Sequence, residues 1–291
     1  MLRQRVITAL IMLAVLVAVL SASSPIPFIV LALVMMAAAA WEWARLVGIS
    51  GPGALAVGAG LLLLCVLSWS TGGLGKTMGW WWGVTAIWTV LGGVLIGSGV
   101  QVWSKWPVVV RLLLGVLMLW AGWLAVVQSR LLGVNYLLSV LALVAAADIA
   151  AYFAGRAFGG KWVARRLAPS ISPNKSWEGV FGGMLGVIAL AALWVAFDRW
   201  VAPPEWSSSL YTRLLEAGSW PVLMGSAMAL SALSVVGDLV ESLVKRAAGF
   251  KDSSQLLPGH GGVLDRIDAQ LPTLPFALAL ASTAAYAGVV R

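Results

Sequence analysis

Apolar runs long enough to cross a lipid bilayer recur along the whole chain, and this pattern constrains the fold more than any other feature. A helix needs about 20 such residues to span the hydrocarbon core. Runs of this kind cover residues 6–22, 26–46, 54–70, 79–98, 108–127, 135–155, 178–197, 220–244 and 270–289. The sequence lacks the alternation typical of a transmembrane β-barrel. We therefore predict an all-α polytopic integral membrane protein with about nine transmembrane helices.

The scarcity of charge supports a membrane protein and excludes soluble classes. Charged residues make up 10% of the chain and hydrophobic residues 61%, whereas an average globular chain has roughly 25% and 45–50%. The mean hydropathy of +0.95 agrees. The single cysteine, Cys65, excludes a disulfide scaffold. Each remaining charge is costly in lipid, so we expect it to lie outside the bilayer or to have a function.

The positions of Lys and Arg predict the orientation, because cytoplasmic loops carry an excess of these residues. A cytoplasmic N-terminus puts fourteen of the nineteen bases on the inner side, and nine spans then place the C-terminus outside. This rule largely accounts for the net charge of +8, so no nucleic-acid partner is needed. Arg3 and Arg5 precede a first apolar run as long as a span, which favours an uncleaved helix over a signal peptide.

Most of the 17 tryptophans lie near the ends of the predicted spans. Indole rings favour the headgroup level of the bilayer. We therefore expect an interfacial position for Trp41, Trp43, Trp80, Trp81, Trp82, Trp103, Trp106, Trp200, Trp206 and Trp220.

The acids are distributed unevenly along the chain. Residues 1–147 contain one acid, Glu42, and the rest of the chain contains ten. Two windows, 148–178 and 238–268, hold seven of the eleven acids and nine of the nineteen bases. Both windows lie at the inner face in the predicted topology. We therefore divide one integrated membrane domain into apolar scaffold helices over residues 1–140 and a catalytic part over residues 141–291.

The second window has the spacing of a metal and phosphate site. Asp238, Glu241 and Lys245 share one helix face by their spacing of three and seven residues. Asp265 and Asp268 are three residues apart, so their charges repel unless a cation lies between them. Hard oxygen ligands favour Mg²⁺, which retains water and shares phosphate oxygens.

A glycine-rich loop and several bases complete this window. Residues 259–262 read Gly-His-Gly-Gly, and such a loop can turn backbone N–H groups toward an anion. An ordinary solvated loop would explain the bases, but it explains Asp265 and Asp268 poorly, because the positive-inside pattern requires no acids. The bases available to bind phosphate are Lys245, Arg246, Lys251 and Arg266.

The first window contains an acid inside a predicted span. Asp148 follows seven apolar residues, and an acid at membrane depth is a functional candidate. The alternative is a structural partner for a buried arginine or a neighbouring helix. Residues 172–178 are typical of a loop entering a helix, with Asn174 or Ser176 as the N-cap. Lys175 is then placed to bind phosphate, or it serves only as an interfacial anchor.

The stretch from Ser242 to Asp268 resembles the signature of the phosphatidate cytidylyltransferase (CDP-diglyceride synthase) family at every specified position. The segments around Asp148 and over residues 172–179 also resemble the family. Small departures are Ile149, Ser254 and Ala269, where a small hydroxyl residue, glycine and serine are common. Residues 1–140 carry no signature beyond their hydrophobicity.

The resemblance implies transfer of the cytidylyl group of CTP to phosphatidate, which gives CDP-diacylglycerol and pyrophosphate. The implied cofactor is Mg²⁺, with or without a second cation. Since a phosphate monoester is already an anion near neutral pH, no general base is required. The implied metal ligands are Asp238, Asp265, Asp268 and Asp148. Lys245 and Arg246 join the first three as catalytic residues. The implied substrate-binding residues are Lys175, Ser172, Lys251, Asp252, His260, Gly261, Gly262 and Arg266.

The implied partners are CTP, membrane lipid and phosphatidate from the inner leaflet, and a homodimer is compatible with them. We expect a multi-pass protein of the inner (plasma) membrane whose active site faces the cytoplasm. One competing interpretation is a secondary transporter with Asp148 as its ion site, although the chain shows no internal repeat. Another is a CDP-alcohol phosphotransferase, whose Asp-Gly-x-x-Ala-Arg motif the chain lacks. A third is a scaffold that has lost catalysis.

Overall fold

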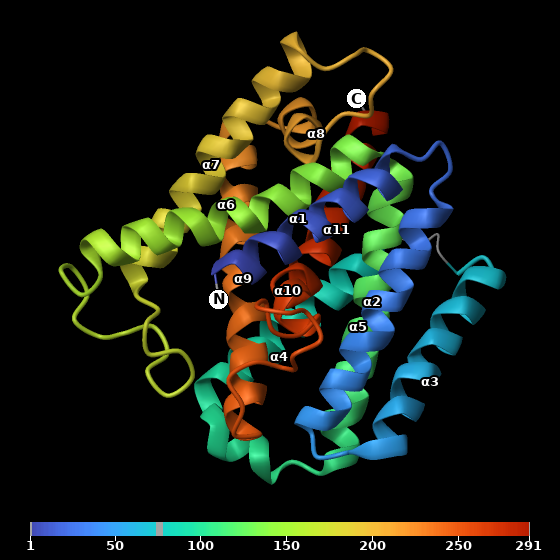
Figure 1. Cartoon of the computed structure of the whole chain (residues 1–291). Helices are drawn as coiled ribbons and strands as arrows, with labels where there is room; N and C mark the ends of the chain where they lie inside the picture. The colour runs from blue at the N-terminus through green and yellow to red at the C-terminus, as the bar shows by residue number, and fades with distance from the viewer. Residues whose placement is uncertain (1, 74–77, 291) are drawn as a thin grey trace.

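The protein is a bundle of helices (Figure 1). The computed structural model describes residues 2–73 and 78–290, with side chains over 3–73 and 78–286. Within these ranges there are helices and no strand, which confirms the all-α prediction. The long helices are α1 (Leu2–Ser21), α2 (Ile26–Leu46), α3 (Gly51–Ser70), α4 (Met78–Lys105), α5 (Val108–Leu132), α6 (Val134–Phe158), α7 (Trp177–Trp200), α9 (Trp220–Ala247) and α11 (Gln270–Val290). Two short helices are α8 (Leu210–Ala217) and α10 (Leu264–Ile267).

Eight helices in the described part of the chain are long and apolar enough to cross a membrane. They are α1 to α7 and α9. The ninth predicted run also forms a helix, the 21-residue α11, whose last four side chains lie outside the described residues. The prediction of about nine spans is therefore close. The orientation of the two termini stays a prediction.

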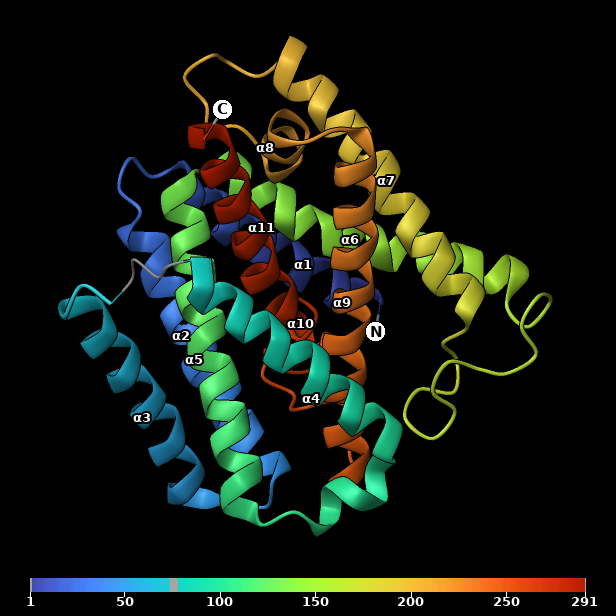
Figure 2. The same cartoon turned by 180° about the vertical axis from the view of Figure 1, so that it is seen from behind.

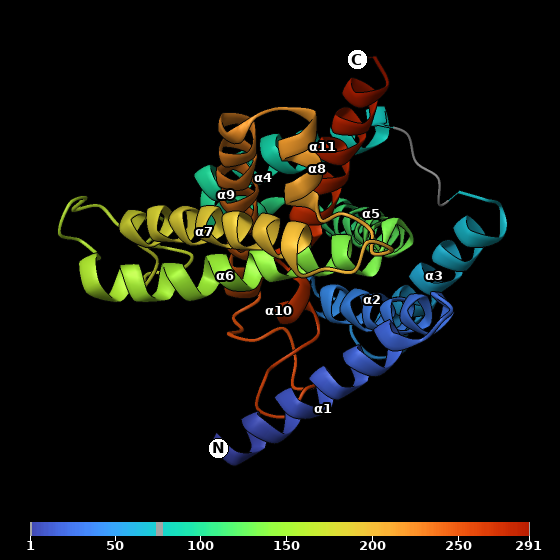
Figure 3. The same cartoon turned by 90° about the horizontal axis from the view of Figure 1, so that it is seen from above.

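The helices are arranged around α11, which packs against α4, α5, α8 and α9. Helices α2, α3 and α5 lie together on one side, and α6 and α7 form a closely packed pair on the other (Figure 1). Helix α4 crosses α9 and α11 on the face of the molecule that is turned to the viewer in Figure 2. Helix α1 lies outside the bundle beside α2, and the loop before α10 extends toward it (Figure 3).

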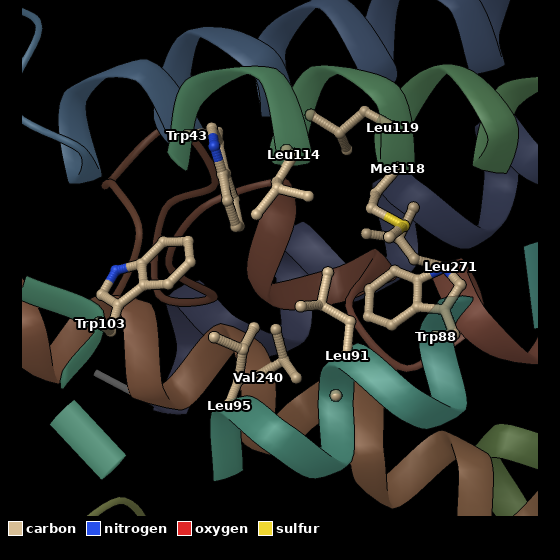
Figure 4. A pocket seen from close by; sticks show the side chains of 12 residues that line it. Trp43, Trp88, Leu91, Leu95, Trp103, Leu114, Met118, Leu119, Val240 and Leu271 are labelled. Atoms are coloured by element: carbon tan, nitrogen blue, oxygen red, sulfur yellow. The ribbon is translucent and has the colours of Figure 1, made fainter. Parts of the chain in front are cut away.

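Three of the tryptophans expected at the headgroup level are buried among helices and do not face lipid. Trp43, Trp81 and Trp103 are at most 8% exposed. The rings of Trp43 and Trp103 meet edge to face at 6.1 Å around a small apolar cavity (Figure 4). A Cβ atom at Gly115 of α5 would lie 2.0 Å from the Trp43 ring, so only glycine fits there. By contrast, Trp200 is 84% exposed. Nearness to a span end does not determine which way an indole faces.

Small residues let α6 and α7 approach closely, as in many membrane helix pairs. A Cβ atom at Gly182 would lie 2.1 Å from Ala154 Cβ, and one at Gly186 would lie 2.4 Å from Ala150 Cβ. These contacts occur along the helix that carries Asp148. The close contact between α6 and α7 therefore positions Asp148 relative to α7.

We predict that Gly182→Ala lowers the free energy of unfolding by about 1–3 kcal/mol, because the added methyl group forces the α6 and α7 backbones apart. The thermal unfolding midpoint in detergent measures this effect. Gly225→Ala in α9 is the matched control, since nothing lies within 4 Å of its added Cβ. Its midpoint should be unchanged or slightly higher, because alanine favours a helix. Equal midpoints for the two variants would contradict the close contact.

Candidate active site

Lys245 forms two ion pairs, one within α9 and one that joins α9 to α10. Its Nζ lies 2.5 Å from Glu241 Oε2 and 2.5 Å from Asp265 Oδ1. The three side chains are 11%, 4% and 6% exposed, so both ion pairs are largely removed from water. Glu241 and Lys245 are four residues apart on α9, as the predicted shared face requires. Breaking such a buried pair leaves a charge without compensation.

Asp238 pairs with a lysine from a different part of the chain. Its carboxylate accepts a hydrogen bond from Lys175 Nζ and one from Ser242 Oγ at 3.2 Å. Lys175 lies immediately before α7, where Ser176 Oγ accepts the Gly179 N–H at 3.2 Å. Ser176 is therefore the N-cap, rather than Asn174. This cap fixes the end of the loop that carries Lys175.

A polar hollow of about 560 Å³ opens beside this ion pair, between α6, α7 and α9. Asp148 lies in its wall on α6, inside a span as predicted. The structure thus brings together predicted residues from both windows of the sequence. The predicted residues lining the hollow are Asp148, Ser172, Lys175 and Asp238, and Tyr152 and Arg156 add to them.

Asp268 is brought beside α9 by a glycine. A Cβ atom at Gly237 would lie 2.4 Å from Asp268 O and 2.8 Å from Pro272 Cγ, so the chain can pass there only because Gly237 has no side chain. Burial and the nearby charge of Asp238 raise the pKa of Asp268 to about 7. Asp238 and Asp268 are thus two carboxylates that repel each other at close range.

Asp265 is bound by the loop that precedes it. Its Oδ2 accepts hydrogen bonds from Ser253 N, Ser253 Oγ and Gly262 N at 2.9, 2.8 and 2.8 Å. Burial alone would raise its pKa, but hydrogen bonds from Lys245 and Gly262 hold it at about 2. In the glycine loop, the N–H of Gly262 thus points at the carboxylate of Asp265. That the loop binds a substrate anion stays a prediction.

Two buried glutamates, Glu42 and Glu178, organise the site loops, and neither is among the site residues predicted from the sequence. Glu42 of α2 accepts four hydrogen bonds from residues 253–264. Glu178 of α7 accepts the backbone N–H groups of residues 160, 162 and 163 on Oε1 at 2.9–3.1 Å. The available signal for Glu42 was its isolation as the one acid among residues 1–147.

A second polar hollow, of about 850 Å³, lies on the loop between α9 and α10. The first turns of α1 form part of this region, because Thr8 Oγ1 donates to Pro258 O at 2.8 Å. Arg246 lies elsewhere and donates to the carbonyls of Ile171 and Phe250 at 3.4 and 3.2 Å. The predicted residues lining this hollow are Lys251, Asp252, His260, Gly261 and Arg266, and Gln4 and Arg5 join them.

Comparison with known proteins shows the family to which the chain belongs. A sequence profile described as the cytidylyltransferase family matches residues 3–284. The chain belongs to this family. A phosphatidate cytidylyltransferase of Pseudomonas aeruginosa is 36% identical over 287 residues, which cover 96% of this chain and 97% of that protein. One of Haemophilus influenzae is 46% identical over 144 residues, 50% of this chain and 44% of that protein. Phosphatidate cytidylyltransferase 5, chloroplastic, of Arabidopsis thaliana is 40% identical over 132 residues, 44% of this chain and 27% of that protein.

The charges of this cytidylyltransferase family member suit a cation. Four carboxylates, those of Asp238, Glu241, Asp265 and Asp268, share two ammonium groups, those of Lys175 and Lys245. If all six are ionised, the charges sum to minus two, and hard oxygen atoms fit Mg²⁺. Over residues 2–73 and 78–290, no three His, Cys, Asp or Glu side chains converge closely enough to hold a metal ion. The four predicted metal ligands, Asp148, Asp238, Asp265 and Asp268, therefore stay predictions.

We predict that Lys245→Met lowers the free energy of unfolding by about 3–5 kcal/mol, because it leaves Glu241 and Asp265 buried without their cation. Thermal unfolding in detergent measures the loss. Lys251→Met is the control, since Lys251 is exposed. Adding Glu241→Leu to Lys245→Met should raise the unfolding midpoint again in part, because it removes one of the two uncompensated carboxylates. A Lys245→Met protein as stable as the control would show that the two ion pairs do not stabilise the fold.

Proposed function

We propose that this chain is a phosphatidate cytidylyltransferase, which transfers the cytidylyl group of CTP to phosphatidate and releases pyrophosphate. The observation that carries the proposal is the position of the carboxylates between two polar hollows. Asp238 lines the hollow between α6, α7 and α9, while Asp265 lies against Gly261 in the wall of the second. Two phosphate-bearing substrates can therefore approach this group of carboxylates, one from each hollow.

The reaction needs positioning and charge neutralisation more than proton transfer. An oxygen of the phosphatidate phosphate forms a bond to the α-phosphorus of CTP. The bond from that phosphorus to the oxygen bridging to the β-phosphorus breaks, and the electron pair leaves with pyrophosphate. Because the attacking phosphate is already ionised near neutral pH, His260 is not needed as a base.

We assign the hollow between α6, α7 and α9 to phosphatidate. Its wall combines the cations Lys175 and Arg156 with Asp148, and next to that acid α6 exposes Ile149 and Phe153 by 60% and 63%. The bases suit the lipid phosphate, and the apolar residues suit acyl chains that remain in the bilayer. This arrangement supports entry of the substrate from the inner leaflet.

We assign the second hollow to the triphosphate of CTP. Arg5, Lys251 and Arg266 line it together with His260, and one acid, Asp252, accompanies them. Such a surplus of positive charge suits a polyanion. Magnesium, when bound, would neutralise charge developing on the transferred phosphoryl group, and Asp238 and Asp268, with Asp148 nearby, would hold it.

We place the protein in the inner membrane with this site at the cytoplasmic face. Bases crowd the helix ends that surround the site, namely Arg45 at the end of α2, Arg156 at the end of α6 and Lys245 at the end of α9. That distribution supports a cytoplasmic position by the positive-inside rule.

Pyrophosphate release from CTP, phosphatidate and Mg²⁺ by the purified chain tests the function. We predict release with CTP and little with ATP. Asp238→Asn and Asp268→Asn should each lower kcat by roughly a hundredfold or more, since each removes a charge facing the reacting phosphates. Glu205→Gln is the control, because Glu205 is exposed in the loop after α7, away from the site. Full activity of both aspartate variants would rule out this site.

A second measurement tests the nucleotide hollow. We predict that Arg5→Ala raises KM for CTP by roughly tenfold and leaves KM for phosphatidate unchanged, because it removes one charge-assisted phosphate contact. Arg3→Ala is the matched control: it removes the same charge two residues away on α1, and Arg3 does not line the hollow. Equal effects of the two variants would mean that α1 contributes only general positive charge.

A further inference from the structure

We propose that Glu42 is a positioning residue for the transfer: from the apolar half of the chain it fixes the loop over residues 253–264, and through this loop the positions of Asp265 and Lys245. The role in catalysis rests on the proposed cytidylyl transfer. The contacts of Glu42 described below do not depend on that proposal. Glu42 is fully buried on α2, close to its cytoplasmic end in the predicted topology.

The contacts of Glu42 all reach one loop far away in the sequence. Its Oε1 accepts from Ser254 Oγ at 2.5 Å and from Val263 N at 2.9 Å. Its Oε2 accepts from Leu264 N at 2.7 Å and lies 3.2 Å from Ser253 Oγ, whose single hydrogen it shares with Asp265 Oδ2. The partners are 211–222 residues away along the chain. One side chain thus connects both ends of the loop to α2.

These contacts require a carboxylate. The N–H groups of Val263 and Leu264 can only donate, and each faces a different oxygen of Glu42. Both terminal atoms of the side chain at position 42 must therefore be acceptors. Glutamine offers one acceptor and one NH₂ group, so it would leave a backbone N–H facing another donor. A serine hydroxyl could rotate to adapt, but a backbone N–H could not.

The loop passes its position on to the carboxylate cluster. Ser253 and Gly262, which lie against Glu42, donate to Asp265 Oδ2, and Asp265 Oδ1 accepts from Lys245. A Cβ atom at Gly262 would lie 2.0 Å from Ser253 Oγ and 2.5 Å from Glu42 Oε1, so there is no room for a side chain at this position. The order of contacts runs from α2 through the loop to Asp265, Lys245 and α9.

No cation shares this role. In the part of the chain that the structure describes, ion pairs join Lys175 with Asp238 and Lys245 with Glu241 and Asp265, and none involves Glu42. A buried carboxylate is costly, and here hydrogen bonds alone replace its hydration. An apolar residue would avoid this cost in a helix that faces other helices. The acid is therefore best explained by the orientation that it imposes on the loop.

The test compares wild type, Glu42→Gln and Glu42→Asp as full-length chains in detergent. Glu42→Gln should lower kcat by roughly tenfold or more, with KM for phosphatidate within about twofold, because Asp265 and Lys245 lose their fixed positions and the lipid hollow does not. Amide hydrogen exchange should rise over residues 252–264 and stay unchanged in α6. Glu42→Asp keeps both acceptors on a shorter side chain and should recover part of kcat.

Gly115→Ala is the control for general destabilisation. It presses on Trp43, the neighbour of Glu42, without touching the loop, so it should lower the unfolding midpoint and retain kcat. Unchanged exchange over residues 252–264 in Glu42→Gln would overturn the proposal. So would an equal loss of kcat in Gly115→Ala at the same midpoint. If the wild type released no pyrophosphate, the proposed function would fail, and the exchange experiment would still decide whether Glu42 fixes the loop.

Discussion

A carboxylate removed from water is costly unless N–H groups, hydroxyls or cations replace its hydration. In this chain that constraint connects distant segments, because the replacements come from elsewhere in the sequence. Glu42 of α2 is satisfied by the loop before α10, and Asp265 by that loop and by Lys245 of α9. Asp238 of α9 is paired with Lys175, which precedes α7. Each of these three acids therefore brings a further segment to the same place, and together they form the candidate site.

The lipid-facing helices make this possible by their small residues. Glycines on α7 let it lie against alanines on α6, which places Asp148 and Lys175 in the wall of one hollow. Gly237 does the same on α9, since it lets the chain at Asp268 pass beside Asp238. Close packing of membrane helices depends on such residues because the hydrophobic effect does not distinguish a helix from lipid. The same packing that holds the bundle together thus sets the distances between the charges.

Much of this could be predicted from the sequence, because the relevant signals are local. Hydropathy over about 20 residues identified the helices, and Ser176 was one of two N-cap candidates. The spacing of Glu241 and Lys245 predicted a shared face on α9. The role of Glu42 could not be predicted, since its partners are 211–222 residues away and nothing in its neighbourhood indicates them. The burial of Trp43 and Trp103 could not be predicted for the same reason, since the residues that bury them come from other helices. The partner of Lys175 could not be predicted either, because Asp238 is 63 residues away in the sequence.

The bases of the site are not distributed like its acids, and this difference matters for substrates that are themselves anions. Lys245 lies among the buried carboxylates, whereas Arg156, Lys251 and Arg266 lie on the exposed walls of the two hollows. In the proposed function, an approaching phosphate therefore meets these bases, which outnumber the exposed wall acids Asp148 and Asp252, before it meets the carboxylates around Lys245, and this attraction favours its capture. The acids behind the bases would repel the same phosphate unless a cation neutralises them. In the proposed function, capture at the walls and transfer beside the carboxylates are thus separate electrostatic tasks that different residues carry out.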